Sequence, residues 1–133
     1  MRANQKTTST REMVEAYVRA WNAADHRGVS SIFAPGAVFI INRGDPCDGR
    51  QAIEEMARGF FHDVPDLELT TELLRPAETH VLHAWTFTGH HFETRNPLKV
   101  GGWEEWELAP DGRVQKSLGW YDADDYARQI AGE

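Results

Sequence analysis

The chain has 133 residues, enough for one domain with one core, and its 41% hydrophobic and 26% charged residues are typical of a globular protein. A formal net charge of −7 without a Lys/Arg cluster argues against nucleic acid or an anionic membrane as a partner. The single cysteine, Cys47, rules out an intrachain disulfide framework. With no apparent signal peptide and no membrane-length apolar run, we expect a cytoplasmic protein.

The first half of the chain is predicted to be mainly helical. Residues 1–8 are polar and predicted to form a disordered tail before a single domain at residues 9–133. Residues 9–12 have the spacing of a capping box, so the first helix is expected to begin there, with Tyr17 and Trp21 on its apolar face. A short second helix is predicted from Asp25. A buried strand at residues 38–41 then precedes a third helix capped by Asp48.

Strand patterns follow from residue 67 onward. Residues 67–73 and 80–92 alternate as two strands, and neither face of the second carries a charge. We therefore expect both faces of that strand to be covered, one of them by a second subunit in a homodimer. Residues 100–122 read as a hairpin around the turn at residues 109–112. The predicted order is three helices with one early strand, then a four-stranded antiparallel meander, which is an α+β fold with a cupped sheet.

Glu104 is the residue of the hairpin that most needs an explanation. Alternation puts it on one face with Trp106 and Leu108, and a carboxylate among apolar side chains is costly unless it is paired, neutralised or used. If Leu108 pairs with Val114, Glu104 lies opposite Leu118 and diagonal to Lys116. Two interpretations follow: a pocket acid with a raised pKa, or a structural ion pair with Lys116.

Several phrases in their order along the chain carry a family resemblance: YVRAWNAAD, GRQAIEEM, PDLEL, TFTGHH and DGRVQKSLGWYDADDYARQIAG. On these phrases the chain resembles the nuclear transport factor 2-like superfamily, in its SnoaL-like and ketosteroid isomerase-like branches. The resemblance implies a cone-shaped, cystatin-like α+β fold. Three N-terminal helices would pack on a strongly curved antiparallel sheet that encloses a pocket.

The resemblance also implies roles for particular residues. Ketosteroid isomerases hold an oxyanion with a tyrosine of the first helix and a protonated carboxylic acid, and Tyr17 and Glu104 stand at those positions. The position of their catalytic base falls on Ile41, which cannot accept a proton, so classical steroid isomerisation is not expected. SnoaL-like cyclases place an acid–base aspartate where Asp122 stands, although an aspartate there also suits a helix cap.

The sequence therefore predicts an acid–base enzyme for a hydrophobic or polycyclic carbonyl compound, without a cofactor or metal. Isomerisation, aldol-type cyclisation and dehydration remain open, as does a non-catalytic ligand-binding or dimerisation module. The predicted catalytic residues are Tyr17, Glu104, Asp122 and His91, the last because an imidazole titrates near neutral pH, although a surface histidine is the alternative. The predicted substrate-binding residues are Trp21, Ile41, Phe60, Trp85, Trp106, Leu118 and Trp120.

Overall fold

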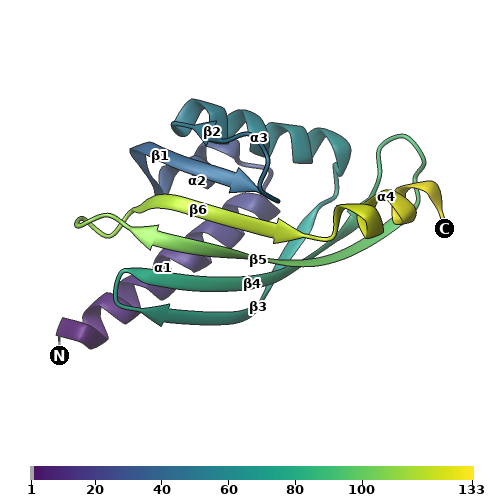
Figure 1. The fold of residues 1–133 in the computed structure, drawn as a ribbon. Coiled ribbons are helices and arrows are strands. Elements are labelled where there is room, and N and C mark those ends of the chain that lie inside the picture. The colour runs from purple at the N-terminus through teal and green to yellow at the C-terminus, as the bar shows by residue number, and fades with distance from the viewer. Residues whose placement is uncertain (1) are drawn as a thin grey trace.

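The computed structural model describes residues 2–133, with side chains from residue 9 onward (Figure 1). The disordered tail predicted at residues 1–8 lies outside the residues described in full. The elements are α1 (Arg2–Asn22), α2 (His26–Ser31), β1 (Phe33–Ile41), β2 (Cys47–Asp48), α3 (Arg50–Asp63), β3 (Glu68–Ala77), β4 (His80–His90), β5 (Pro97–Leu108), β6 (Val114–Tyr121) and α4 (Ala123–Ala131).

The strands form one curved six-stranded sheet in the order β2-β1-β6-β5-β4-β3. Strands β3 to β6 make the predicted antiparallel meander. Strand β1 lies parallel to β6, however, so the sheet is mixed and the prediction of a wholly antiparallel sheet is wrong. The prediction of three N-terminal helices is not exactly matched, because β1 and β2 lie between the second helix and the third, and a fourth helix, α4, follows the meander.

Strand β1 begins five residues earlier than the sequence predicts, at Phe33 instead of position 38. Pro35 lies within it, at a place where the register with β6 shifts between Phe33 and Val38. Such an irregularity tolerates proline because no ladder hydrogen bond is needed there. The Val114 N–H donates to the Ile32 carbonyl at 2.9 Å, which joins the start of β1 to β6.

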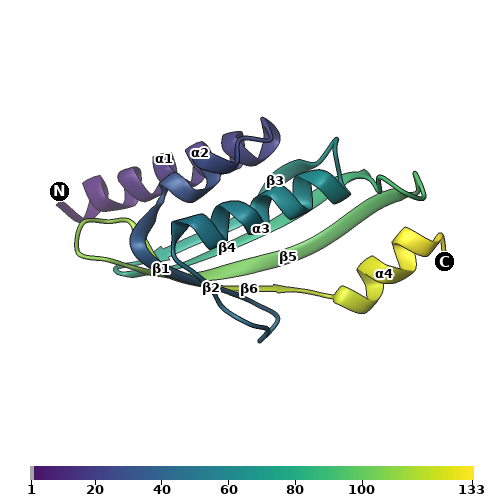
Figure 2. The ribbon, with the colours of Figure 1, turned by 90° about the horizontal axis from the view of Figure 1, so that it is seen from above.

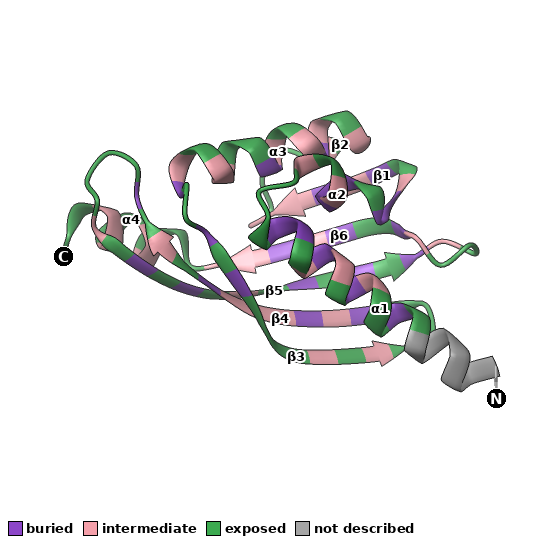
Figure 3. Cartoon of the chain, turned by 180° about the vertical axis from the view of Figure 1, so that it is seen from behind, coloured by how far each residue is buried: buried purple, intermediate pink, exposed green. Residues whose placement is uncertain are grey.

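Helices α1, α2 and α3 cover one face of the sheet, as the view from above shows (Figure 2). Buried residues are found on these helices and on the strands that they cover (Figure 3), and Tyr17, Ile53 and Val114 are fully buried. Asn22 fixes the end of α1 to β3, because its Nδ2 donates to the Leu69 carbonyl at 3.1 Å and its Oδ1 accepts from the Leu69 N–H. No helix in the described part of the chain is long and apolar enough to span a membrane.

The helix caps follow the sequence only in part. Asp25 Oδ1 accepts from the Gly28 N–H at 3.0 Å and so caps α2 as predicted. Asp48, by contrast, lies in β2, and Gly49 is the N-cap of α3 with a φ of 90°, a backbone angle that suits glycine. Residues 9–12 lie inside α1, so the capping box predicted there does not mark the start of the helix.

A bulge in β6 changes which residues face the helices. Leu108 pairs with Val114 as predicted, but the register then shifts, so Glu107 pairs with Lys116 and Glu104 pairs with Gly119. One extra residue in a strand moves every following side chain to the other face. The predicted placement of Lys116 and Leu118 beside Glu104 is therefore wrong, and Lys116 is exposed on the far face of the sheet.

Candidate functional site

A cavity opens between the helices and the concave side of the sheet. Its unfilled space is about 520 Å³, including the part open to solvent, and about 50 Å³ is accessible to the centre of a water molecule. A single buried water needs only about 10–15 Å³ by the second measure, so the cavity has room for a few waters or part of a small ligand. The walls are mainly aromatic and aliphatic, and Glu104 is the only carboxylate among the described residues that line them.

Three donors from three different elements surround the Glu104 carboxyl group. Its Oε1 accepts from Trp106 Nε1 at 2.9 Å, from the Tyr17 hydroxyl at 3.0 Å and from Ser117 Oγ at 3.1 Å. Its Oε2 is 3.1 Å from the same Tyr17 hydroxyl, which has a single proton to share between the two oxygens. Oε1 therefore has three hydrogen-bond donors, whereas Oε2 has only the shared Tyr17 hydroxyl.

The fold places these donors by local geometry. Trp106 follows Glu104 by two residues on β5 and so shares its face of the sheet. Ser117 reaches that face because the bulge in β6 turns it inward, where it is fully buried. Tyr17 comes from α1, and its ring packs edge-on against Trp106 with a centroid distance of 5.5 Å.

Burial raises the pKa of Glu104 from its ordinary value of 4.5 to about 7. The hydrogen bonds from Trp106, Tyr17 and Ser117 act in the opposite direction, because they stabilise the charged form. The pKa of Tyr17 is raised well above its ordinary value by burial and then by the nearby Glu104 charge. Near neutral pH Tyr17 therefore remains a neutral donor, while Glu104 is divided between its acid and its carboxylate.

His83 is a buried neighbour of this cluster that the sequence analysis did not select as a site residue. It pairs with Glu104 across β4 and β5 and is completely buried. Its Nε2 lies 2.9 Å from Thr71 Oγ1, while its Nδ1 has no partner among the described residues. Burial lowers the pKa of His83 to about 4, so its ring is neutral near pH 7.

The structure brings together most of the side chains that were predicted to bind substrate. Of the seven, Trp21, Ile41, Phe60 and Trp85 line the cavity with their side chains. Trp120 borders it from β6, but its side chain lies on the far face of the sheet against Trp103 and Glu105. Trp106 lies behind the wall as a donor to Glu104, and Leu118 faces the far side of the sheet because of the bulge. The lining residues that the prediction missed are Phe39, Met56, Leu67, Leu69, Phe87, Gly119 and Tyr121.

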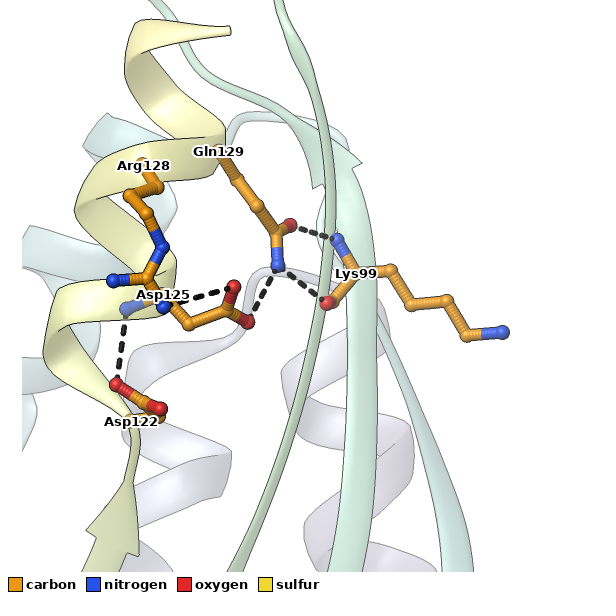
Figure 4. A network of polar contacts seen from close by, with 5 residues as sticks. All are labelled: Lys99, Asp122, Asp125, Arg128 and Gln129. Atoms are coloured by element: carbon orange, nitrogen blue, oxygen red, sulfur yellow. Dashed lines mark hydrogen bonds and ion pairs between the residues drawn. The ribbon is translucent and has the colours of Figure 1, made fainter. Parts of the chain in front are cut away.

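Asp122 lies outside the cavity, at the start of α4. Its Oδ1 accepts from the Asp125 N–H at 2.9 Å, so it caps this helix (Figure 4). Gln129 attaches α4 to β5, since its side chain accepts from the Lys99 N–H at 2.7 Å and donates to the Lys99 carbonyl at 2.9 Å. The position of Asp122 supports the helix-cap interpretation and gives no support to a proton-transfer role in the cavity.

His91 also lies away from Glu104, beside a second hollow on the surface. Its neighbours there include Asp66, His90 and Arg95. It is 6% exposed, and its Nδ1 accepts from the Glu93 N–H at 3.3 Å. Both His91 and Asp122 are therefore separated from the one carboxylate of the cavity.

Solved structures that share this fold include the following three. A protein from Jannaschia sp. CCS1 described as a SnoaL-like polyketide cyclase superposes with a TM-score of 0.85 at 18% identity, covering 95% of this chain and 94% of that one. A ketosteroid isomerase-like fold protein from Catenulispora acidiphila, in complex with trimethylamine, gives 0.82 at 17% identity over 90% and 92%. The epoxide hydrolase/cyclase-like enzyme SalBIII, of pyran ring formation in the polyether salinomycin, gives 0.78 at 18% identity over 90% and 95%.

At these identities the structural similarity establishes the fold alone. No curated protein matches the chain. The profile of the SnoaL-like domain matches residues 14–116, from the middle of α1 into β6. Because that match spans well over half of the sequence, the chain belongs to the SnoaL-like domain family.

Proposed function

We propose that the protein is a cofactor-free acid–base enzyme that acts on a small hydrophobic carbonyl compound, by isomerisation, aldol-type cyclisation or dehydration. The observation that carries the proposal is Glu104, a carboxyl group with a pKa of about 7 on the wall of an apolar cavity. A group whose pKa is near the working pH is present in both the form that gives a proton and the form that takes one. The similar structures described as a polyketide cyclase and an epoxide hydrolase/cyclase-like enzyme support a small-molecule reaction.

The hydrogen bonds around Glu104 indicate which oxygen carries the proton. Oε1 accepts from Trp106, Ser117 and Tyr17, whereas Oε2 has only the shared Tyr17 hydroxyl. Donors stabilise negative charge on the oxygen they bind, so the acid form carries its proton on Oε2. We infer that this O–H donates to the carbonyl oxygen of the ligand and stabilises the negative charge that develops there.

In this proposal Tyr17 acts through Glu104. Its hydroxyl is completely buried, and Tyr17 is not among the residues that line the cavity. It holds the carboxyl group in place instead of touching the ligand, and is thus a positioning residue. Asp122 and His91 have no part in the proposed chemistry, because they lie outside the cavity.

A non-catalytic ligand-binding module is the second candidate function. It is favoured by the absence of a second carboxylate or a histidine from the described lining residues. Ile41 lines the cavity at the position where the resemblance to ketosteroid isomerases places a base. The distinguishing experiment follows deuterium incorporation at the α-carbon of cyclohexanone in heavy water by NMR. We expect the protein to accelerate exchange, Glu104→Gln to abolish the acceleration, and Glu105→Gln to preserve it, because Glu105 lies on the opposite face of β5. Binding of a hydrophobic phenol such as 2-naphthol without any exchange would support the binding module.

We also propose that the protein is a homodimer through the face of the sheet that the helices leave open (Figure 2). Trp103 is 42% exposed on this face and stacks on Trp120 with a centroid distance of 6.4 Å. Leu82 and Leu118 flank Glu105 on the same face. An exposed surface with two tryptophans and several aliphatic side chains is typical of protein interfaces. Sedimentation should give a dimer at micromolar concentration and a monomer for Trp103→Glu, and a monomeric unmodified protein would remove the proposal.

A further inference from the structure

Two tryptophans of the cavity wall carry N–H groups that the protein leaves unused. Trp21 Nε1 and Trp85 Nε1 are buried and have no hydrogen-bond partner among the described residues, and both side chains line the cavity. A buried donor without a partner is costly, and most such groups in folded proteins are satisfied. By contrast, Trp120, whose side chain lies on the far face of the sheet, donates its N–H to Glu105 at 2.7 Å.

The two indole groups face the same polar cluster. Burial is the main influence on the pKa values of Tyr17 and Glu104 and raises both, but Trp21 lowers the first and Trp85 lowers the second as nearby donors. Neither indole N–H has a hydrogen-bond partner within the normal distance among the described residues, so each keeps the capacity to donate to another acceptor.

The ring of Trp85 occupies space that the absence of a side chain at Gly102 leaves free. Trp85 pairs with Gly102 across β4 and β5, and a Cβ at position 102 would lie 2.5 Å from Cη2 of this ring. Any larger residue at 102 would therefore displace the indole. Trp21 is held on the other side of the cavity by edge-on packing against Phe61, at a centroid distance of 5.2 Å, and against Phe60, at 6.0 Å. Both donors are thus fixed by packing.

We propose that Trp21 and Trp85 bind the ligand through their indole N–H groups, and that the ligand is a neutral molecule with at least two acceptor oxygens, such as a dione. This rests on the proposed function in taking the cavity as the ligand site, and it adds the class of ligand. The hydrogen of an indole N–H is positive, so it favours a carbonyl oxygen and disfavours a cation. No Lys or Arg is among the described lining residues, which argues against a carboxylate or phosphate ligand.

The experiment compares three probes of similar ring size: 1,4-cyclohexanedione, cyclohexanone and methylcyclohexane. The readout is the set of indole resonances in ¹H–¹⁵N spectra, assigned with Trp→Phe variants at each position. We expect the dione to bind most tightly and to shift the Trp21 and Trp85 resonances while Trp120 stays unchanged. Trp21→Phe and Trp85→Phe should each weaken dione binding roughly three- to tenfold, the usual net contribution of one hydrogen bond.

Trp120→Phe is the control, because it removes a tryptophan N–H that is already used on the far face of the sheet. It should change the affinities for dione and methylcyclohexane by the same factor, whereas the other two variants should weaken dione selectively. Equal binding of dione and methylcyclohexane, or dione binding that shifts neither indole, would overturn the inference. Tighter binding of tetramethylammonium than of dione at pH 8 would also overturn it, since the cavity would then be an aromatic cage for a cation.

These results separate the inference from the proposed function. Exchange of cyclohexanone protons that depends on Glu104, together with unshifted indoles, would retain the acid–base function and remove the ligand assignment. Dione binding that shifts both indoles without any proton exchange would retain the ligand assignment and remove the catalytic function.

Discussion

The pH dependence of the unfolding free energy tests the protonation states of Glu104 and His83, which are buried and pair across β5 and β4. The pKa of Glu104 is raised from 4.5 to about 7, so the folded state binds a proton that the unfolded chain has already lost between these values. The stability from this group is complete below pH 4.5 and is lost as the pH rises towards 7. The pKa of His83 is lowered from 6.5 to about 4, so its contribution is complete above pH 6.5 and is lost as the pH falls towards 4.

The two effects have similar magnitudes and opposite signs. For each residue, the difference between the folded and the unfolded pKa corresponds to about 3 kcal/mol of stability, at about 1.4 kcal/mol per pKa unit. Between pH 5 and 6.5 the contribution of Glu104 falls by about 2 kcal/mol while that of His83 rises by a similar amount. The unmodified protein should therefore show almost no net pH dependence from this pair, and removing one member should expose the other.

The perturbation is Glu104→Gln, and the assay is urea unfolding followed by tryptophan fluorescence at four pH values from 5 to 6.5. The informative quantity is the difference in unfolding free energy between variant and parent, because it isolates the effect of position 104. That difference should increase by about 2 kcal/mol in favour of the variant from pH 5 to 6.5. Glu105→Gln, at an exposed position on the other face of β5, is the matched control.

A pH-independent difference for Glu104→Gln would refute the reasoning, because it would mean that the folded protein does not hold Glu104 protonated. The companion variant His83→Gln tests the other half. It should make the protein less stable as the pH rises from 5 to 6.5, since only the Glu104 contribution remains.

Three further predictions concern individual side chains. Tyr17→Phe removes a hydrogen bond that stabilises the charged carboxylate, so a ¹³C titration should find the pKa of Glu104 above that of the parent, with a stability loss of about 1 kcal/mol. The unmodified protein should not isomerise Δ5-3-ketosteroids above background, and Ile41→Asp should introduce a trace of activity; robust turnover by the parent would show that the base was sought at the wrong position. Lys116→Met should change the unfolding free energy by less than about 0.5 kcal/mol because Lys116 is exposed. A loss of several kcal/mol would instead support the hypothesis of an ion pair between Lys116 and Glu104.

Local periodicity was enough to predict much of the cavity. Helical spacing puts Tyr17 and Trp21 on the buried face of α1, and both are buried there. Strand alternation puts Glu104, Trp106 and Leu108 on one face of β5, and all three are buried. These predictions depend on the geometry of a single element, which a sequence pattern reports directly. The family resemblance added the element order and is confirmed by the SnoaL-like profile.

The partners of Glu104 could not be predicted in the same way. The extra residue in β6 reverses its alternation, so Ser117 replaces Lys116 beside the carboxyl group, and no local signal marks where a strand bulges. His83 was passed over because its importance depends on pairing with Glu104 across two strands. Asp122 had two possible roles, and the hydrogen bond to Asp125 supports only that of a cap.

The sequence by itself determined that Glu104 would be buried, because alternation along one strand decides which face a side chain takes. Whether that carboxyl group would be neutralised by a lysine or left protonated depended on contacts between strands and helices far apart in the chain. The tertiary structure supplies three neutral donors and, among the residues whose side chains are described, no cation, and desolvation therefore raises the pKa of Glu104 to about 7.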